Sequence, residues 1–121
     1  MMHMTIDEYN KFFAKKAKQN KYRNIKTEVD GIIFDSKAEA RRYGELKLMA
    51  KANEIMGFGI QPSFVLPGGV RYRPDFIVCG KDGKVWCEDV KSAGTLTEGF
   101  KIKHKLWLAH YKWLELKIVR Y

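Results

Sequence analysis

Two aspartates and a lysine in the second half of the chain have the types and spacing of a metal-dependent hydrolytic site. Asp75 follows Pro74, and after thirteen further residues Asp89 and Lys91 stand two apart in a predicted strand. Side chains two apart in a strand point to the same face of its sheet. Mg²⁺ and Mn²⁺ accept hard carboxylate ligands, usually one or two together with water and substrate phosphate. The pattern therefore predicts a Mg²⁺ site, with Mn²⁺ as a substitute, beside a lysine that offsets phosphate charge.

Glu39 is a third candidate carboxylate, carried by a helix predicted for residues 38–52. At about 100° per residue it falls on the same stripe as Tyr43 and Leu46, which are expected to face the core. A carboxylate on that stripe needs a partner, because burying an unpaired charge is costly, and a metal ion would supply one. The alternative is that Glu39, three residues after Ser36, only completes a capping box at the helix start.

Whether Asp75 meets Asp89 depends on the turn between their strands. A three-residue loop at 81–83 sets Asp75 opposite Asp89 and requires Gly83 to adopt a left-handed conformation with positive φ. A two-residue loop would instead set Asp75 opposite Val90 and would separate the two carboxylates. We predict the three-residue loop, on which the cluster depends. Without a metal, the same residues would form a solvated hairpin end with a surface ion pair.

The elements that carry these residues predict an α/β core. Asp30-Gly31 between two short β-prone runs is a strong hairpin signal. The elements predicted after this hairpin are a helix at 38–52, strands at 58–66, 70–79 and 85–91, a helix at 100–112 and a strand at 114–119. The second helix can join two parallel strands by a right-handed crossover. We therefore expect a mixed four-stranded sheet flanked by helices, in the order αβββαβ.

The residues before this core predict a separate arm. Thr5 and Glu8 form a capping box that can open an amphipathic helix at Ile6–Gln19, with its lysines largely off the apolar stripe. A polar, basic connection follows it. We therefore divide the chain into an arm at residues 1–20 and a core at residues 21–121.

Composition restricts the kind of protein and the kind of partner. The 121 residues include 23 Lys and Arg against 14 Asp and Glu, which gives a net charge of +9 and favours a polyanionic partner. The alternative is a basic protein that its charge keeps soluble. We find neither a secretory signal nor the roughly 20 apolar residues of a membrane span, so we expect a cytoplasmic protein without a membrane partner. Two groups are interpreted as core residues: the reduced Cys79 and Cys87, and Trp86, Trp107 and Trp113.

The motif residues, taken together, resemble a known group. Pro74-Asp75 followed by Asp89-Val90-Lys91, with a helical Glu39 ahead of them, resembles the PD-(D/E)XK nuclease superfamily, whose core has the order αβββαβ. The phrases KYRNIKTEVDGIIFDSKAEARRYGELK, IQPSFVL, EDVKS and FKIKHKLW are similar to a family of short phage proteins of unassigned function placed in that superfamily. The resemblance covers about residues 21–121 and implies a restriction-endonuclease-like fold.

The resemblance also implies a role for each matching residue. Glu39, Asp75 and Asp89 would be metal ligands, with the Val90 carbonyl as a further ligand. Lys91 would stabilise charge and position the attacking water. The implied activity is that of a Mg²⁺-dependent endodeoxyribonuclease, which hydrolyses the phosphodiester bond with a metal that polarises the phosphate and activates water.

Basic residues on the two core helices are the candidate DNA contacts. Five such residues are expected at exposed or site-facing positions: Arg41, Arg42, Lys101, Lys103 and Lys105. A solvated helix face is the alternative for Lys105. No element has the character of a base-reading helix, so we expect contacts to the DNA backbone and weak sequence preference.

The substrate is predicted by analogy with the superfamily. A small phage member without a sequence-reading module looks more like a nuclease for branched DNA, such as a Holliday junction resolvase in phage recombination, repair or replication. It would act in the host cytoplasm. Two symmetric cuts call for a homodimer, with the arm as its candidate contact. The alternatives are a non-catalytic nucleic-acid-binding protein on the same scaffold and a nicking or end-processing nuclease.

Overall fold

The computed structural model describes residues 25–92 and 96–121 of the chain. The chain falls into two compact units that divide between Ala40 and Arg41, within one helix. The arm helix predicted for Ile6–Gln19, and the boundary predicted near residue 20, lie outside the described residues. The first unit contains a short hairpin and the start of that helix, and the second contains the sheet.

A tight hairpin forms half of the described part of the first unit. β1 (Thr27–Val29) pairs antiparallel with β2 (Ile32–Phe34). The two residues between them, Asp30 and Gly31, have φ of 54° and 75°. Positive φ at both central positions is typical of a type I′ turn, whose twist matches that of the flanking strands. The hairpin predicted from Asp30-Gly31 is confirmed.

Helix α2 (Lys37–Lys51) begins and ends within one residue of its predicted bounds. Ser36 caps it, since its Oγ accepts a hydrogen bond from the backbone N–H of Glu39 at 3.1 Å. This bond satisfies one of the N–H groups that a helix start leaves free. Beyond the helix, Asn53 has a φ of 59°, the left-handed conformation that commonly terminates helices. Local sequence signals therefore set both ends of α2.

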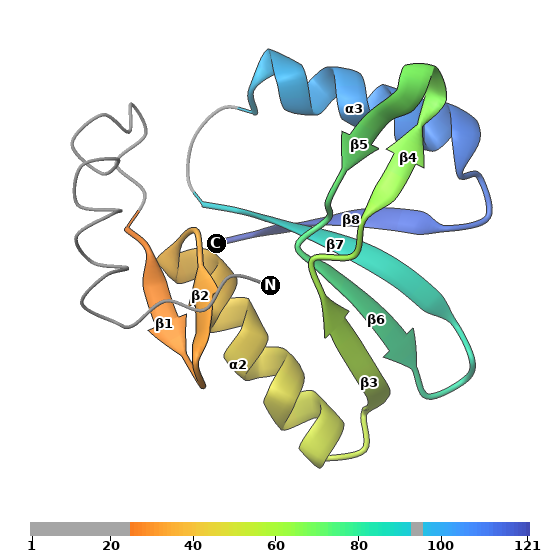
Figure 1. The fold of residues 1–121 in the computed structure, drawn as a ribbon. Helices are drawn as coiled ribbons and strands as arrows, with labels where there is room; N and C mark the ends of the chain where they lie inside the picture. Colours follow the sequence, from red (N-terminus) through yellow and green to blue (C-terminus); the bar gives the residue numbers. More distant parts are fainter. Residues whose placement is uncertain (1–24, 93–95) are drawn as a thin grey trace. The chain divides into compact units, whose positions relative to one another are not determined.

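The second unit is built on a mixed four-stranded sheet (Figure 1). Its strands are β3 (Ile55–Ile60), β6 (Phe76–Gly80), β7 (Val85–Lys91) and β8 (Glu115–Arg120), in that order. Antiparallel ladders join β3 to β6 and β6 to β7, whereas β7 and β8 are parallel. Helix α3 (Glu98–His110) lies between β7 and β8 in sequence, as a crossover between parallel strands requires. The predicted αβββαβ order and the mixed sheet are confirmed.

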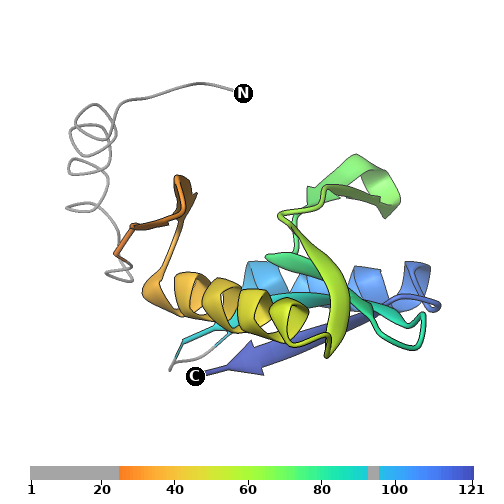
Figure 2. The same ribbon diagram turned by 90° about the horizontal axis from the view of Figure 1, so that it is seen from below.

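Helices α2 and α3 cover opposite faces of this sheet (Figures 1 and 2). Successive side chains of a strand alternate between its two faces. On β7, Glu88 bonds to Arg42 of α2, whereas its neighbour Cys87 packs in one core cluster with Phe100 and Trp107 of α3. The central strand is therefore buried on both faces, with a polar contact on one side and an apolar core on the other.

Two predicted strands are each broken in two. The structure divides residues 58–66 between β3 and β4 (Phe64–Leu66), and residues 70–79 between β5 (Val70–Tyr72) and β6. Each interruption contains a proline, Pro62 in the first and Pro74 in the second. Proline has no N–H to donate to the ladder of a sheet. At this point the chain leaves the sheet, and β4 and β5 form a hairpin of their own that projects from it (Figure 2).

The turn between β6 and β7 has the predicted odd loop. Cys79 pairs with Val85, and inside that pair the Gly80 N–H donates to the Lys84 carbonyl at 2.7 Å. Gly83 has a φ of 84°. Three residues are thus left in the loop, with the glycine in the left-handed conformation that such loops need. The ladder keeps the predicted register as far as its last pair, Phe76 with Glu88, which directly precedes residues 75 and 89.

Replacing Gly83 with alanine is expected to lower the free energy of unfolding by about 1–2 kcal/mol. A Cβ at this position meets no atom within 4 Å, so the cost comes from the positive φ alone. Gly44, inside α2, is the matched control: its added Cβ also meets nothing within 4 Å, and its φ is not positive. Gly44→Ala should therefore stabilise the protein by roughly 0.5–1 kcal/mol. Urea unfolding of both variants would measure this, and two shifts of the same sign would contradict it.

Trp107 is the centre of the core on the α3 side of the sheet. It is fully buried, and its indole N–H donates to the Leu114 carbonyl at 2.8 Å. The other buried residues of this cluster come from the β4–β5 hairpin, the sheet, α3 and the connection from α3 to β8: Leu66, Tyr72, Cys87, Phe100, Leu114 and Leu116. No helix among the described residues is long and apolar enough to span a membrane.

Two residues predicted to be in the core are at the surface instead. Trp113 is 76% exposed, because Leu114, the next residue, takes the buried position in the connection to β8. Cys79 is also exposed, while Cys87 is buried as predicted. Burial raises the pKa of the Cys87 thiol to about 12, so this residue is an inert apolar side chain.

Candidate active site

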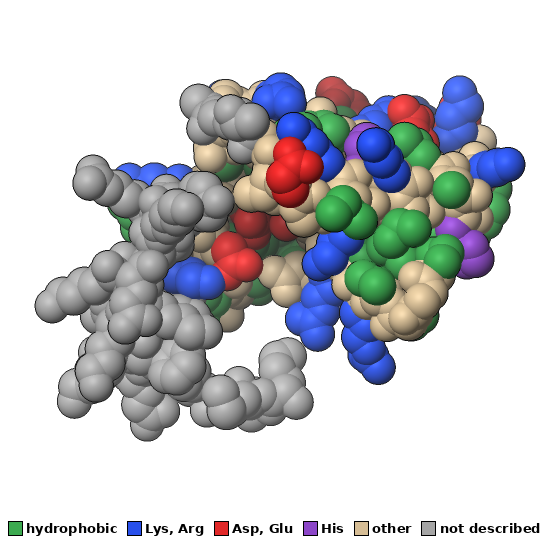
Figure 3. All heavy atoms as spheres, turned by 90° about the horizontal axis from the view of Figure 1, so that it is seen from above, with side chains coloured by type: hydrophobic (Ala, Val, Ile, Leu, Met, Phe, Trp, Pro, Cys, Tyr) green, Lys and Arg blue, Asp and Glu red, His purple; other side chains and the backbone are tan. Residues whose placement is uncertain are grey.

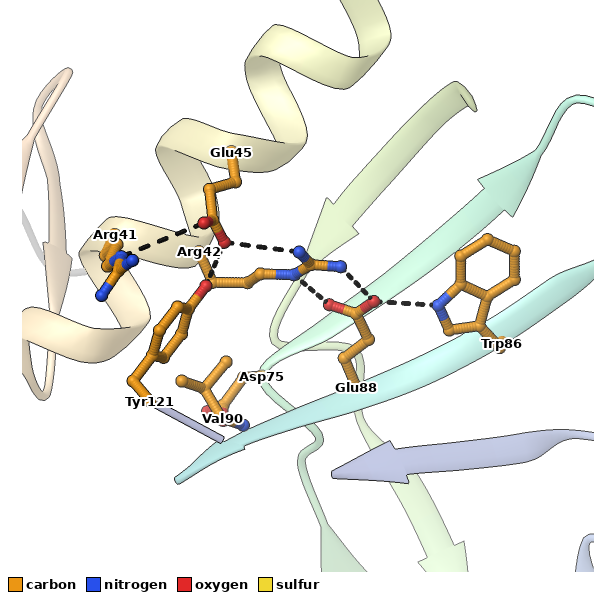
Figure 4. A network of polar contacts seen from close by, with 8 residues as sticks. All are labelled: Arg41, Arg42, Glu45, Asp75, Trp86, Glu88, Val90 and Tyr121. Atoms are coloured by element: carbon orange, nitrogen blue, oxygen red, sulfur yellow. Dashed lines mark hydrogen bonds and ion pairs between the residues drawn. The ribbon is translucent and has the colours of Figure 1, made fainter. Parts of the chain in front are cut away.

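Asp75 lies where the β6–β7 ladder ends. The last pair of that ladder is Phe76 with Glu88, so one further step along the same register brings Asp75 opposite Asp89. The Asp75 N–H donates to the Glu88 carbonyl at 2.9 Å, and its Oδ2 accepts a hydrogen bond from the Val90 N–H at 2.7 Å. The second bond holds the Asp75 carboxylate against the backbone of β7, beside Val90 (Figure 4).

Asp89 is a buried carboxylate with an unused oxygen. Its residue exposure is 3%, and its Oδ2 has no hydrogen-bond partner among the described residues. Burial raises its pKa to about 6, and the charge of Lys91 and a backbone hydrogen bond from Asp75 oppose that rise. A buried carboxylate oxygen without a donor is costly unless a proton or a cation occupies it. The chemistry of this position therefore fits a hard cation.

Lys91 lies two residues further along β7, on the same strand face as Asp89. Its ammonium sits 4.1 Å from the centroid of the Phe100 ring, at the start of α3. A cation at that distance from an aromatic face is attracted to the ring. The lysine is thus held near Asp89 while remaining half-buried and not enclosed.

The carboxylates of the described residues do not form a ready-made cage. No group of three or more His, Cys, Asp or Glu side chains in residues 25–92 and 96–121 is arranged to hold a metal ion. Glu39 belongs to the first unit, so its predicted approach to Asp75 and Asp89 remains a prediction. Mg²⁺ needs only one or two carboxylates when water and phosphate complete its shell. Asp89 on β7 and Asp75, just before β6, are two carboxylates of the kind that Mg²⁺ accepts.

Residues 19–121 match a family described as "Protein of unknown function (DUF1064)". The chain belongs to this family. No curated protein and no solved structure matches it. The family match covers all the residues of the candidate site, and its description leaves their chemistry open.

On the other face of β7, this DUF1064 chain has a buried ion pair that the sequence did not predict (Figure 4). The Arg42 guanidinium binds both oxygens of Glu88, with Nε to Oε1 at 2.7 Å and Nη2 to Oε2 at 2.8 Å. Trp86 Nε1 donates to Oε2 of the same carboxylate at 2.9 Å. Glu88 is only 1% exposed. The one available signal was the spacing of Trp86 and Glu88, which places both side chains on one strand face.

The same arginine joins β7 to the last residue of the chain. Arg42 Nη1 lies 3.4 Å from Glu45 on α2, and that carboxylate accepts a hydrogen bond from the Tyr121 hydroxyl. The hydrogen bond from Tyr121 lowers the pKa of Glu45, and burial raises the pKa of Tyr121 to about 12. Arg41 stacks on the Tyr121 ring at 4.4 Å. The network therefore ties α2, β7 and β8 together.

Arg42 is the candidate DNA contact that the structure corrects. Its guanidinium is occupied by Glu88 and Glu45, and its side chain is only 17% exposed, whereas that of Arg41 is 65% exposed. A buried bidentate pair does not release its arginine for an external phosphate without leaving a carboxylate unpaired. Arg41 remains available, and Arg42 becomes a structural residue.

Two of the three basic residues predicted to contact DNA from α3 are exposed. Lys101 and Lys105 are exposed, and Lys103 is half-buried. Lys101 also pairs with Glu98 at 3.3 Å. Figure 3 shows Lys and Arg side chains spread over the α3 side of the molecule, with apolar side chains between them. The positive charge is thus distributed along the helix and does not form one compact patch.

Proposed function

We propose that this protein is a Mg²⁺-dependent DNA endonuclease of the PD-(D/E)XK type. The observation that carries the proposal is Asp89, a buried carboxylate with an unpartnered oxygen, in register with Asp75 and two residues from Lys91. The αβββαβ order and the net charge of +9 support it, since they supply the expected scaffold and favour a polyanionic substrate.

Each side chain has a proposed task. Asp75 and Asp89 would hold the metal ion, with Glu39 as a third carboxylate and the Val90 carbonyl as a further ligand. Mg²⁺ or Mn²⁺, when bound, supplies a Lewis acid for the phosphate and a water of lowered pKa. Lys91 would neutralise phosphate charge and orient the attacking water from the same strand face. Its contact with Phe100 limits where its ammonium can move.

Branched DNA is the proposed substrate and a homodimer the proposed assembly. The exposed basic side chains lie on more than one element, Arg41 on α2 and Lys101 and Lys105 on α3, and suit contacts to the DNA backbone. A backbone footprint distinguishes DNA by shape more than by sequence. Two symmetric cuts at a four-way junction would need two sites related by a two-fold axis.

The test is a cleavage assay on linear, nicked, flapped and four-way DNA with Mg²⁺, with Mn²⁺ and with EDTA. We expect cleavage only with metal, fastest on the four-way substrate. If about six phosphates are neutralised per protomer, a plot of the logarithm of the DNA-binding constant against the logarithm of the salt concentration should have a slope near −5. Binding without cleavage under every metal condition would favour the non-catalytic alternative, and equal cleavage of linear and four-way DNA would favour a general nuclease.

A further inference from the structure

The β4–β5 hairpin has one face fixed to the core. Phe64 on β4 and Tyr72 on β5 both meet the Trp107 ring edge-on, with centroids 4.8 Å and 5.8 Å from it. The Tyr111 hydroxyl, just beyond α3, donates to the Val65 carbonyl at 2.7 Å. Aromatic packing of this kind and a backbone hydrogen bond restrict the hairpin to one orientation on α3. The hairpin is therefore a rigid projection.

The opposite face of the hairpin is basic and exposed. Side chains alternate along the strands, so Arg71, paired with Val65, points away from Tyr72 and the core. Arg73 follows directly after β5, and both arginines are exposed. Neither forms an ion pair with any described residue. Residues 61–74 contain no acidic side chain, so nothing within the hairpin offsets this charge.

This face leads directly into the candidate active site. Arg73 is separated from Asp75 only by the buried Pro74. Two residue steps along an extended chain span about 7 Å, so Arg73 and Arg71 can lie at most roughly one and two such distances from Asp75. Arginines within that range of Asp75 suit contacts with phosphates next to one that would be cut there.

The tip of the hairpin permits a close approach. Pro67, Gly68 and Gly69 form its turn, and a Cβ built on either glycine meets no atom within 4 Å. A turn without bulky side chains leaves room for a duplex to lie against the ribbon. A two-stranded ribbon is also one of the elements that the major groove admits.

We propose that the outer face of the β4–β5 hairpin is a binding surface for the backbone of duplex DNA, with Arg71 and Arg73 contacting phosphates next to the cleavage position. The inference rests on the proposed nuclease function for the identity of its ligand. Arg71 and Arg73 were not among the contacts predicted from the sequence, which were all on helices. Arginine in this role holds the phosphate by paired, charge-assisted hydrogen bonds.

The experiment measures binding of a fluorescently labelled linear duplex, in EDTA to prevent cleavage, across a range of salt concentrations. Arg71→Gln/Arg73→Gln should weaken binding on the order of tenfold and should make the salt slope shallower by about 2, one unit for each phosphate that the variant no longer neutralises. Arg71→Lys/Arg73→Lys should recover the salt slope, because lysine still binds phosphate as a point charge. Unchanged thermal unfolding midpoints would show that all variants are folded.

Lys81→Gln/Lys84→Gln is the matched control. It removes the same charge from the exposed β6–β7 turn, at the other end of the strands from Asp75. Its salt slope should equal that of the wild type. A Gln variant of the hairpin that binds like this control would overturn the hairpin inference alone, because wild-type cleavage with Mg²⁺ tests the nuclease function separately. A Lys variant as weak as the Gln variant would overturn the assignment to phosphate contacts.

Discussion

Arg42→Met is expected to lower the free energy of unfolding by about 3–5 kcal/mol, because it leaves the Glu88 carboxylate buried without its counter-charge. Glu88 is 1% exposed and receives two bonds from Arg42, so the single bond from Trp86 would have to satisfy it alone. The loss is large against the roughly 5–15 kcal/mol that stabilises a typical domain. Urea unfolding followed by tryptophan fluorescence would measure it.

Arg41→Met is the control for this prediction. Arg41 is the neighbouring arginine, 65% exposed, with a 3.9 Å ion pair to Glu45 and a stack on Tyr121. Exposed contacts of this kind contribute at most about 1 kcal/mol. The double variant Arg42→Met/Glu88→Leu should regain most of the lost stability, because it removes both buried charges together. Equal costs for the two single arginine variants would contradict the buried ion pair.

Asp89→Ala is expected to reduce Mg²⁺-dependent cleavage by about 10²–10³-fold, the scale on which removal of one catalytic electrostatic group acts. DNA affinity should hold or rise, since the change removes a negative charge near the phosphate. Asp82→Ala is the matched control: it removes an exposed aspartate from the turn of the same hairpin. If the Asp89 variant cleaved DNA as fast as the Asp82 variant, Asp89 would not be part of the active site.

Lys91→Ala in the same assay separates metal binding from phosphate stabilisation. The variant should slow hydrolysis by a similar factor, while the concentration of Mg²⁺ that gives half-maximal rate changes little, because the carboxylates remain. Lys84→Ala, from the far turn of the hairpin, should cut normally. A large increase in the Mg²⁺ requirement of the Lys91 variant would show that the lysine organises the metal ligands.

The buried network and the candidate site are connected through one strand. Glu88 and Asp89 are neighbours on β7 and point to opposite faces, with Glu88 toward α2. The ion pair with Arg42 holds the strand at the residue beside Asp89. The position of Asp89, the proposed metal ligand, therefore depends on a contact that lies on the other side of the sheet.

The sequence alone determined the features that depend on a few neighbouring residues. Asp30-Gly31 predicted the first hairpin, Ser36 predicted the start of α2, and a glycine at position 83 predicted the odd loop. That loop in turn set the register of β6 and β7, and with it the alignment of residues 75 and 89. These features could be predicted because turn and cap geometries are set by backbone dihedral angles that only certain residues adopt at low cost.

The tertiary structure decided where each charged side chain goes. Arg42 and Glu88 are 46 residues apart and pair only because α2 packs on β7. The division of two long predicted strands, which places Arg71 on a separate hairpin, also depends on packing around Trp107. The burial of Asp89 likewise follows from elements distant in sequence. A sequence pattern gives the face of a strand on which a residue lies, but its burial and its partner depend on which element covers that face.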